Sequence, residues 1–489
     1  MKFLAMSKAS RLRRWLRRLA IGAVSLVAIA FGAHHAIGCA TRLEPPAVQL
    51  PSATLVEAEG VRRVGAAYAK QRGAILEVRL AGSPEAIGSQ MATLLRPEMI
   101  AIEGELFGQF RQYVPLAPVR ALLVDLAKLQ FRDADLGMSE ARRHELAAQA
   151  IGFAPDPFTD VMATYDRFVY LSSLYDVSLS FEHSPLLGCT SFVARGDATA
   201  GGHVLLARNF DFEAGPSFDR GKAVFLVFED GRIPYASVSW PGFIGAFSGM
   251  NKEGLALVVH GGRARDVVPG GEPVPHTMRE VLARARTVDE AIAILAERKP
   301  MVSHIVLLAD AAGDAAAIER APGVAPHARR AAPILSLTNH FEGPLASDPK
   351  NQAIRDNTST LARRDRLDEL LAARTDALSA EGAIEILRDK KGMGGADLSL
   401  GDRHALDALI ATHAIVADAT SKVLWVSEGP HLAGRFVAFD LAKLLDLGRD
   451  PGHHEPIVTS PADPILEDGR YGAWEREGSP HGGEPGAGR

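Results

Sequence analysis

Gly188 and Cys189 stand where the hydrophobic pattern of this chain changes its period. Before them, apolar residues such as Ile87, Met91 and Leu94 recur at three- and four-residue spacing, which is typical of helices. After them, short apolar runs separated by glycine and aspartate predict antiparallel hairpins. The change of period therefore predicts an α+β fold, in which a mainly helical region precedes layered antiparallel sheets.

Four hairpins are predicted after Cys189. Their strand pairs are TSFVA with HVLLA, AVFLVF with IPYASVSW, HIVLLAD with AAAIERA, and AIVADA with KVLWVS. Helical patterns at residues 277–298 and 358–373 lie between them. Before Cys189, a first strand is predicted within residues 73–80 by the alternation in ILEVRL, and helices are predicted from residue 84 onward and at 121–129, 140–150 and 158–174.

Residues 1–38 have the composition of an export signal. A basic run at residues 11–18 precedes an uncharged apolar run at residues 19–33. The following Ala36-Ile37-Gly38-Cys39 resembles the site at which bacterial lipoproteins are cleaved and lipidated, here on Cys39. An uncleaved membrane anchor over residues 19–37 is the alternative. Both interpretations tether the protein to a membrane and place most of it in the periplasm or at another extracytoplasmic face.

The chain is predicted to divide into five segments. They are a signal peptide or anchor at 1–38, a proline-rich tether at 39–72, a mainly helical region at 73–188, a strand-rich domain at 189–450, and a flexible tail rich in glycine and proline at 451–489.

Charge and cysteine content exclude two classes of protein. The first 38 residues carry seven basic residues and no acid, so that without them the formal net charge moves from −5 to about −12. Nucleic acid is not expected as a partner, because phosphate binding needs a basic surface. The only two cysteines, Cys39 and Cys189, do not form the framework of a small disulfide-stapled module.

Cys189 is the first candidate for chemistry. Breaking the Gly188–Cys189 bond would make it the first residue of a new chain. Arg208 and Asp211 stand three residues apart at the end of the next predicted strand. An arginine near a thiol stabilises the thiolate, and a carboxylate can hold an amine or a guanidinium in place.

Several motifs occur in a familiar order. GCTSFVARG precedes LLARNFDF; GSPEAIGSQMATLL lies upstream; FIGAFSGMNKEGLAL, SLTNHF and ARRDRLDELL lie downstream. Together, over roughly residues 75–430, they resemble the isopenicillin-N acyltransferase family, and more distantly the bile-salt hydrolases and acid ceramidases. These are N-terminal-nucleophile (Ntn) cysteine hydrolases, whose precursor cuts itself before the cysteine.

The resemblance implies a four-layer αββα sandwich and self-cleavage between Gly188 and Cys189, which makes residues 73–188 a pro-region and 189–450 the catalytic chain. The α-amine of Cys189, whose pKa is ordinarily roughly 8, would then serve as the base for its own thiol. Arg208 and Asp211 would orient the nucleophile and its amine. Asn339 would donate a hydrogen bond to the oxyanion that forms during acyl transfer.

Three further positions follow from the same resemblance. The second oxyanion donor falls on His260 or Gly261, so that either the histidine side chain or a backbone N–H would donate. A late arginine of the family has no aligned counterpart, and Arg403 is the nearest candidate. Arg363 and Arg366 lie on a charged helix, where we expect surface or packing roles.

The resemblance implies a small-molecule amide or thioester as substrate and requires no cofactor and no metal. It leaves a homo-oligomer open. We favour hydrolysis of an N-acylated small molecule, because an exported enzyme has little access to acyl-coenzyme A. Two alternatives remain: a papain-type cysteine hydrolase that uses His340 as base without self-cleavage, and a non-catalytic lipoprotein that binds an acylated ligand.

Overall fold

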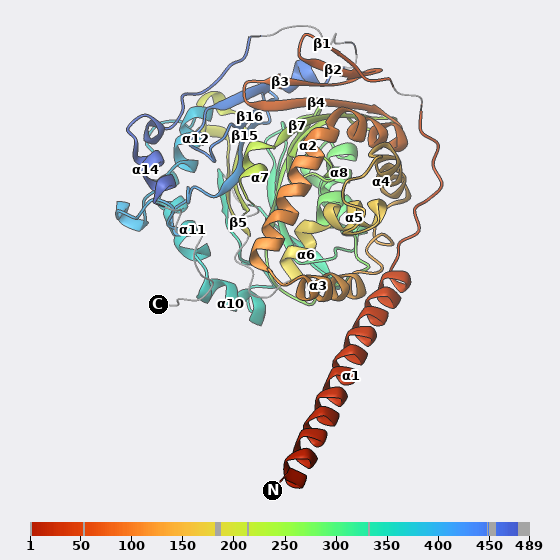
Figure 1. Cartoon of the computed structure of the whole chain (residues 1–489). Coiled ribbons are helices and arrows are strands. Elements are labelled where there is room, and N and C mark those ends of the chain that lie inside the picture. Colours follow the sequence, from red (N-terminus) through yellow and green to blue (C-terminus); the bar gives the residue numbers. More distant parts are fainter. Residues whose placement is uncertain are drawn as a thin grey trace. The chain divides into compact units, whose positions relative to one another are not determined.

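The computed structural model describes residues 2–51, 54–180, 187–212, 215–330, 333–446, 448 and 456–477 (Figure 1). The chain divides into two compact units. The smaller unit combines Met1–Glu44 with Phe107–Asp133, and the larger unit combines Pro45–Leu106 with Ala134–Arg489.

Helices build the smaller unit. They are α1 (Lys2–Ala40), the end of α2 (Pro84–Tyr113) and α3 (Ala117–Gln130). Within α1, the 29 residues Leu12–Ala40 are long and apolar enough to cross a membrane. Length and composition do not distinguish a membrane span from an export signal, so both interpretations of the N-terminus stay open.

The larger unit contains two sheets. The first has 11 strands, in the order β1-β2-β3-β4-β7-β8-β9-β10-β11-β12-β13. All neighbours in it are antiparallel except β4 and β7, which run parallel. Its strands are β1 (Val56–Ala58), β2 (Val61–Val64), β3 (Ala67–Arg72), β4 (Ile75–Gly82), β7 (Ala223–Glu229), β8 (Tyr235–Ser239), β9 (Ser248–Asn251), β10 (Ala256–Gly261), β11 (His304–Ala309), β12 (Ala315–Ala321) and β13 (Val324–Arg329).

The second sheet is antiparallel and has six strands, in the order β14-β5-β6-β15-β16-β17. Its strands are β5 (Leu187–Ala194), β6 (Leu205–Phe212), β14 (Ile334–Leu337), β15 (Ala411–Asp418), β16 (Val423–Ser427) and β17 (Phe436–Asp440). The four predicted hairpins are confirmed. Their strands pair antiparallel as β5–β6, β7–β8, β11–β12 and β15–β16.

The two sheets share one apolar core. Val193 and Leu206 of the second sheet pack in the same buried cluster as Val258 and Leu307 of the first. Successive side chains of a strand point to opposite faces. Phe192, the neighbour of Val193, accordingly belongs to a second buried cluster on the other face of the second sheet.

Helices pack against both sheets. The second cluster joins β5, β6 and β15 to α11 (Thr360–Ala372) and α12 (Ala380–Leu387), which lie beside these strands in Figure 1. Helix α8 (Val274–Arg284) contacts β9 and β10, and α9 (Val288–Glu297) contacts β12 and β13. The remaining helices are α4 (Glu140–Gly152), α5 (Thr164–Ser172), α6 (Leu174–Ser180), α7 (Pro216–Arg220), α10 (Pro349–Asn357), α13 (Leu441–Leu444) and α14 (Arg470–Arg476).

Part of the predicted tether is folded. Strands β1, β2 and β3 occupy residues 56–72, which the prediction assigns to a tether. Glu59 and Gly60 both have positive φ, and they form a two-residue turn that matches the twist of a hairpin. The region called mainly helical also supplies β4, which lies between β3 and β7 in the first sheet.

Part of the predicted tail is folded as well. Residues 464–476 include a short 3₁₀ turn and α14, and Ile465 and Tyr471 are buried against Leu409 and Ala433. The periodic apolar pattern in this segment covers only a few residues, and the surrounding glycines and prolines favour the prediction of an irregular tail. Residues 451–455 and 478–489 lie outside the described residues.

Candidate active site

Strand pairing brings Cys189 to the two residues predicted to assist it. In the register of β5 and β6, Gly188 is opposite Asp211, and Ser191 is opposite Arg208. An odd spacing puts Arg208 and Asp211 on opposite faces of β6. Cys189 shares the face of Arg208, whereas Gly188 shares that of Asp211. The two candidates therefore serve different sides of the Gly188–Cys189 bond.

Arg208 is fixed against the sulfur of Cys189. Both side chains are fully buried, and Nη2 of Arg208 donates to Sγ at 3.4 Å and to the carbonyl oxygen of Val259 at 2.8 Å. Nη1 donates to the carbonyl oxygen of Phe247 at 3.0 Å, and the guanidinium lies 4.1 Å from the centre of the Phe210 ring. These contacts hold a positive charge beside the atom that would become a thiolate.

Asp211 lies against Gly188. A Cβ atom built on Gly188 would stand only 3.0 Å from Oδ2 of Asp211, so the missing side chain allows this close approach. Burial raises the pKa of the Asp211 carboxyl to about 7, although the charge of Arg363 opposes the shift. A carboxyl that titrates near neutral pH can accept or donate a proton beside this peptide bond.

Asn339 and Arg363 hold the backbone of Cys189. The N–H of Cys189 donates to Oδ1 of Asn339 at 2.8 Å, and Nη2 of Arg363 donates to the same oxygen at 2.9 Å. Nη1 of Arg363 donates to the carbonyl oxygen of Cys189 at 2.6 Å and to Oγ1 of Thr190 at 2.8 Å. Nδ2 of Asn339 donates to the carbonyl oxygen of Gly261 at 2.9 Å.

The expectation for Arg363 was incomplete. Its side chain is only 4% exposed, and its hydrogen bonds reach the candidate nucleophile itself. Arg366, one turn further along α11, instead forms two bonds of 2.9 Å to the carboxylate of Asp389, which fits the packing role expected for it. The R-x-x-R motif thus contains one residue of the site and one structural ion pair.

A cavity of about 640 Å³ opens on the Gly188 side of the bond. Gly188, Asp211, Asn339 and Arg363 line it together with Arg403, the candidate for the late arginine. Its other lining residues are Ser178, Leu179, Gly261, Gly262, Arg263, Ile354, Asp356, Asn357, Thr358, Ser359, His404, Ala408 and Ile410. The buried Sγ of Cys189 is not part of this wall.

His260 lies away from the cavity. It is fully buried, its Nε2 is 2.6 Å from Oγ of Ser191, and burial lowers the pKa of its imidazole well below the ordinary value. Its neighbour Gly261 does line the cavity and contacts Asn339. Of the two positions predicted for the second oxyanion donor, the structure brings Gly261 and not His260 to the cavity wall.

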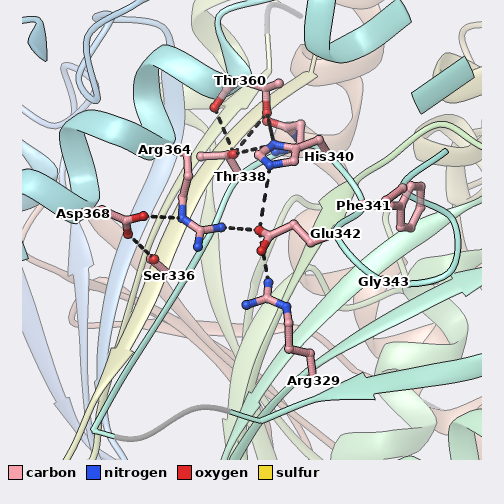
Figure 2. Close-up of polar contacts among 12 residues, drawn as sticks. Arg329, Ser336, Thr338, His340, Phe341, Glu342, Gly343, Thr360, Arg364 and Asp368 are labelled. Carbon is pink, nitrogen blue, oxygen red and sulfur yellow. Dashed lines mark hydrogen bonds and ion pairs between the residues drawn. The ribbon is translucent and has the colours of Figure 1, made fainter. Parts of the chain in front are cut away.

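His340 belongs to a separate polar cluster, shown in Figure 2. Its Nδ1 is 3.1 Å from the hydroxyls of Thr338 and Thr360, and its Nε2 faces Glu342 at 3.8 Å. Glu342 also pairs with Arg364. Burial lowers the pKa of His340 to about 4. These partners direct the ring toward α11, and no hydrogen bond joins it to Cys189 among the described residues.

Aromatic side chains surround the Cys189 side of the bond. Phe210 is opposite Cys189 in the β5–β6 register, and it stacks on Phe247 with ring centres 5.7 Å apart. Tyr175 meets Phe247 edge to face, also at 5.7 Å. Burial and the nearby Cys189 raise the pKa of Tyr175. The thiol therefore lies beside aromatic rings, with Arg208 and the carbonyl oxygen of Val259 as polar neighbours.

A buried thiol beside an arginine, at a glycine–cysteine bond that borders a cavity, defines a candidate cysteine nucleophile. Residues 198–396 match the family model described as acyl-coenzyme A:6-aminopenicillanic acid acyl-transferase. The matched region covers less than half of the chain and begins after Cys189, and it agrees with the resemblance that the sequence motifs show.

Individual relatives are distant. The chain is 29% identical over 190 residues to an uncharacterized protein of Archaeoglobus fulgidus, a match that covers 35% of this chain and 30% of that protein. It is 22% identical over 172 residues to the N-acylethanolamine-hydrolyzing acid amidase of Mus musculus, covering 33% and 46%. The chain thus matches less than half the length of either relative. A conjugated bile acid hydrolase structure from Clostridium perfringens aligns over 56% of this chain and 97% of its own, with 12% identity and a TM-score of 0.38.

Proposed function

We propose that this protein is a cysteine amidohydrolase or acyltransferase that matures by cutting its own Gly188–Cys189 bond. It then acts on an N-acylated small molecule through a thioester at Cys189, within a four-layer αββα sandwich. The observation that carries the proposal is the set of contacts around this single bond. Arg208 holds the sulfur, Asn339 and Arg363 hold the backbone, and the cavity borders Gly188.

In maturation, Sγ of Cys189 attacks the carbonyl carbon of Gly188. The C–N bond breaks, the nitrogen of Cys189 takes up the thiol proton, and a thioester joins Gly188 to Sγ. Water then hydrolyses the thioester and leaves a carboxylate on Gly188 and a free thiol and α-amine on Cys189. Asn339 already accepts from this nitrogen, and Asp211 lies against Gly188 on the other side of the bond, where its carboxyl is the titratable group proposed to exchange protons during the cut.

In catalysis, the new α-amine takes the thiol proton and the thiolate attacks the acyl carbon of the substrate. The protonated amine then gives its proton to the departing amine, and a thioester forms on Cys189. Water, or a second amine, releases the acyl group. Nδ2 of Asn339 supplies an oxyanion donor when it exchanges the carbonyl oxygen of Gly261 for the substrate.

The segment before the cut is expected to stay bound. Strand β4 is hydrogen-bonded to β7 inside the first sheet. On α6, both carboxylate oxygens of Asp176 accept from the N–H of Val274, at 3.0 and 3.2 Å. On α4, Glu145 is buried with Arg279 of α8 at 2.7 Å. Dissociation of this segment would break these contacts, leave β7 as an unpaired sheet edge and leave buried charges without partners. Each of these changes is unfavourable in free energy.

The surroundings favour an apolar acyl group. The aromatic residues around Cys189 give apolar surroundings, although the space among them is only about 10 Å³ in the uncut chain, whereas the cavity beyond Gly188 carries Arg263 and Arg403 and suits a polar amine portion. N-acyl amino acids and N-acylethanolamines, the latter hydrolysed by the mouse relative, form the first substrate panel. Hydrolysis is favoured over transfer because we place the protein outside the cytoplasm, tethered by residues 1–38 or by lipid on Cys39.

Intact mass spectrometry of the purified protein tests the maturation step. The expected result is two fragments that meet between Gly188 and Cys189. Cys189→Ala abolishes both the cut and turnover of every N-acyl substrate, whereas the matched variant Cys39→Ala is cut normally. An unbroken chain with full activity would contradict the proposal.

The two alternative functions make different predictions. A papain-type enzyme loses activity in His340→Ala, whereas our proposal expects a modest loss, because His340 contacts Thr338 and Thr360 and not the nucleophile. A non-catalytic binding protein leaves Cys189 unlabelled by a thiol-reactive acyl probe after processing.

A further inference from the structure

Helix α3 turns its apolar side chains outward. Its large apolar residues recur at spacings of three, one, three and three, a pattern that a helix of a soluble domain directs toward the core. Here the same stripe is exposed. Its residues and exposed fractions are Val119 40%, Leu122 56%, Leu123 43%, Leu126 53% and Leu129 42%, and Leu116 and Tyr113 extend it at 65% and 76%.

The one buried side chain of α3 is charged. Asp125 is 5% exposed and accepts from Nδ1 of His34 on α1, at 2.8 Å. Helices α1 and α3 pack together within the smaller unit. Helix α3 thus has a packing partner, which it meets through a charged residue while its apolar stripe stays exposed. The exposure of the stripe is therefore not explained by the lack of a neighbouring helix.

The position of the contact indicates what covers the apolar stripe. His34 follows the uncharged run 19–33 and lies near the outer end of the predicted anchor at 19–37, and the apolar side chains of α1 are exposed, for example Leu26 at 69% and Phe31 at 74%. A helix that crosses a bilayer leaves the hydrocarbon where its apolar run ends. The contact between His34 and Asp125 thus places α3 at the level of the lipid headgroups when α1 is inserted.

The charges around α3 fit the same surroundings. Residues 107–133 contain four basic residues and two acids, and one of these acids is Asp125, which pairs with His34. An interfacial helix combines an apolar face in the acyl chains with basic residues near the phosphates. Arg120 and Lys128 lie on the same helix as the apolar stripe, and both are partly buried.

We propose that α3 is a second membrane contact, which lies along the bilayer surface beside α1 and inserts Leu122, Leu126 and Leu129 among the acyl chains. The proposal rests on residues 1–38 staying in place as the uncleaved anchor, one of the two tethers given above, and not on the chemistry of Cys189. The smaller unit then is a membrane-binding module formed by two segments that are distant in sequence.

Photo-crosslinking in bilayer discs tests this contact. The full chain is incorporated into discs of phosphatidylcholine and phosphatidylglycerol that hold one copy each, with p-benzoylphenylalanine at position 126 (Leu126→p-benzoylphenylalanine). The matched control carries it at Met393, which is 57% exposed but lies in the larger unit. After illumination, mass spectrometry identifies what is joined to the labelled peptide.

Phospholipid adducts at position 126, at least about tenfold above those at 393, are expected. Adding Leu122→Glu and Leu129→Glu is expected to reduce these adducts about tenfold, since carboxylates are costly at this depth. Normal cutting at Gly188–Cys189 shows that this variant is folded. Equal labelling at 126 and 393, or no incorporation into discs, would each overturn the proposal. Adducts to a second copy of the chain in place of lipid, in larger discs that hold two copies, would overturn it as well. Repeating the measurement with Cys189→Ala separates it from the proposed chemistry, because the lipid adducts should persist without any cut.

Discussion

Replacement of Asp211 by asparagine is predicted to stabilise the uncut protein at high pH and to leave its stability unchanged at low pH. The carboxyl of Asp211 titrates at about 7 in the fold, because burial raises its pKa from the ordinary 3.8. Below pH 4 the folded and the unfolded chain are both protonated at this site. Between pH 4 and 7 the unfolded chain releases the proton while the folded chain retains it, so stability falls as the pH rises.

The size of the effect follows from the two pKa values. Each unit of difference corresponds to about 1.4 kcal/mol, so the carboxyl of Asp211 lowers the free energy of unfolding by about 4 kcal/mol between pH 4 and pH 8. Asparagine has a similar shape and no titration. Asp211→Asn should therefore lack this part of the pH dependence.

Urea unfolding at pH 4, 6 and 8 measures the difference. Both proteins carry Cys189→Ala, so that only the uncut chain is compared. The matched control is Asp397→Asn, whose side chain is 96% exposed, and it should follow the parent at every pH. Parallel pH dependence in the parent and in Asp211→Asn would refute the reasoning, since the carboxyl of Asp211 would then be ionised in the fold without cost.

Two further substitutions test how the scissile bond is held. Arg363→Lys keeps the positive charge but loses the guanidinium geometry that reaches three acceptors, so self-cleavage should slow about tenfold or more in a time course of fragment formation. The matched variant Arg374→Lys changes an arginine that pairs with the exposed Asp376 outside the site, and it should be cut at the parent rate. Gly188→Ala places a methyl group 3.0 Å from Oδ2 of Asp211 and should also slow the cut. The control Gly104→Ala, whose Cβ would meet its nearest neighbour at 3.9 Å, should be cut at the parent rate. Equal rates for both glycine variants would show that the contact with Asp211 is unimportant.

Local patterns predicted the parts of the site that lie close in sequence. Cys189 and Arg208 are joined by one hairpin, and a hairpin is visible in a sequence because its strands and its turn are contiguous. Arg363 reaches Cys189 across 174 residues, from a helix whose many charges are typical of an exposed face. Its burial follows from the packing of α11 against the second sheet, which no local pattern reports.

The same limit applies to the segments outside the site. The strands within residues 56–72 were missed because prolines precede them, although the turn at Glu59 and Gly60 was present as a signal. The helix α3 was correctly predicted. The exposure of its apolar stripe was not predictable, because the helical period shows that apolar residues share one face but not whether that face meets the core or the surroundings.

Arg208 and Asp211 illustrate how a spacing can predict residues and miss their arrangement. An arginine and an aspartate three positions apart were expected to act together on the nucleophile and its amine. In a strand, however, an odd spacing separates two side chains by the thickness of the sheet. Arg208 consequently faces the sulfur among aromatic rings, and Asp211 faces Gly188 and the cavity. If the bond is cut as proposed, the thiol and the amine of Cys189 are controlled from opposite sides of β5. A change of charge at position 211 should then alter proton transfer at the amine without moving the guanidinium that holds the thiolate.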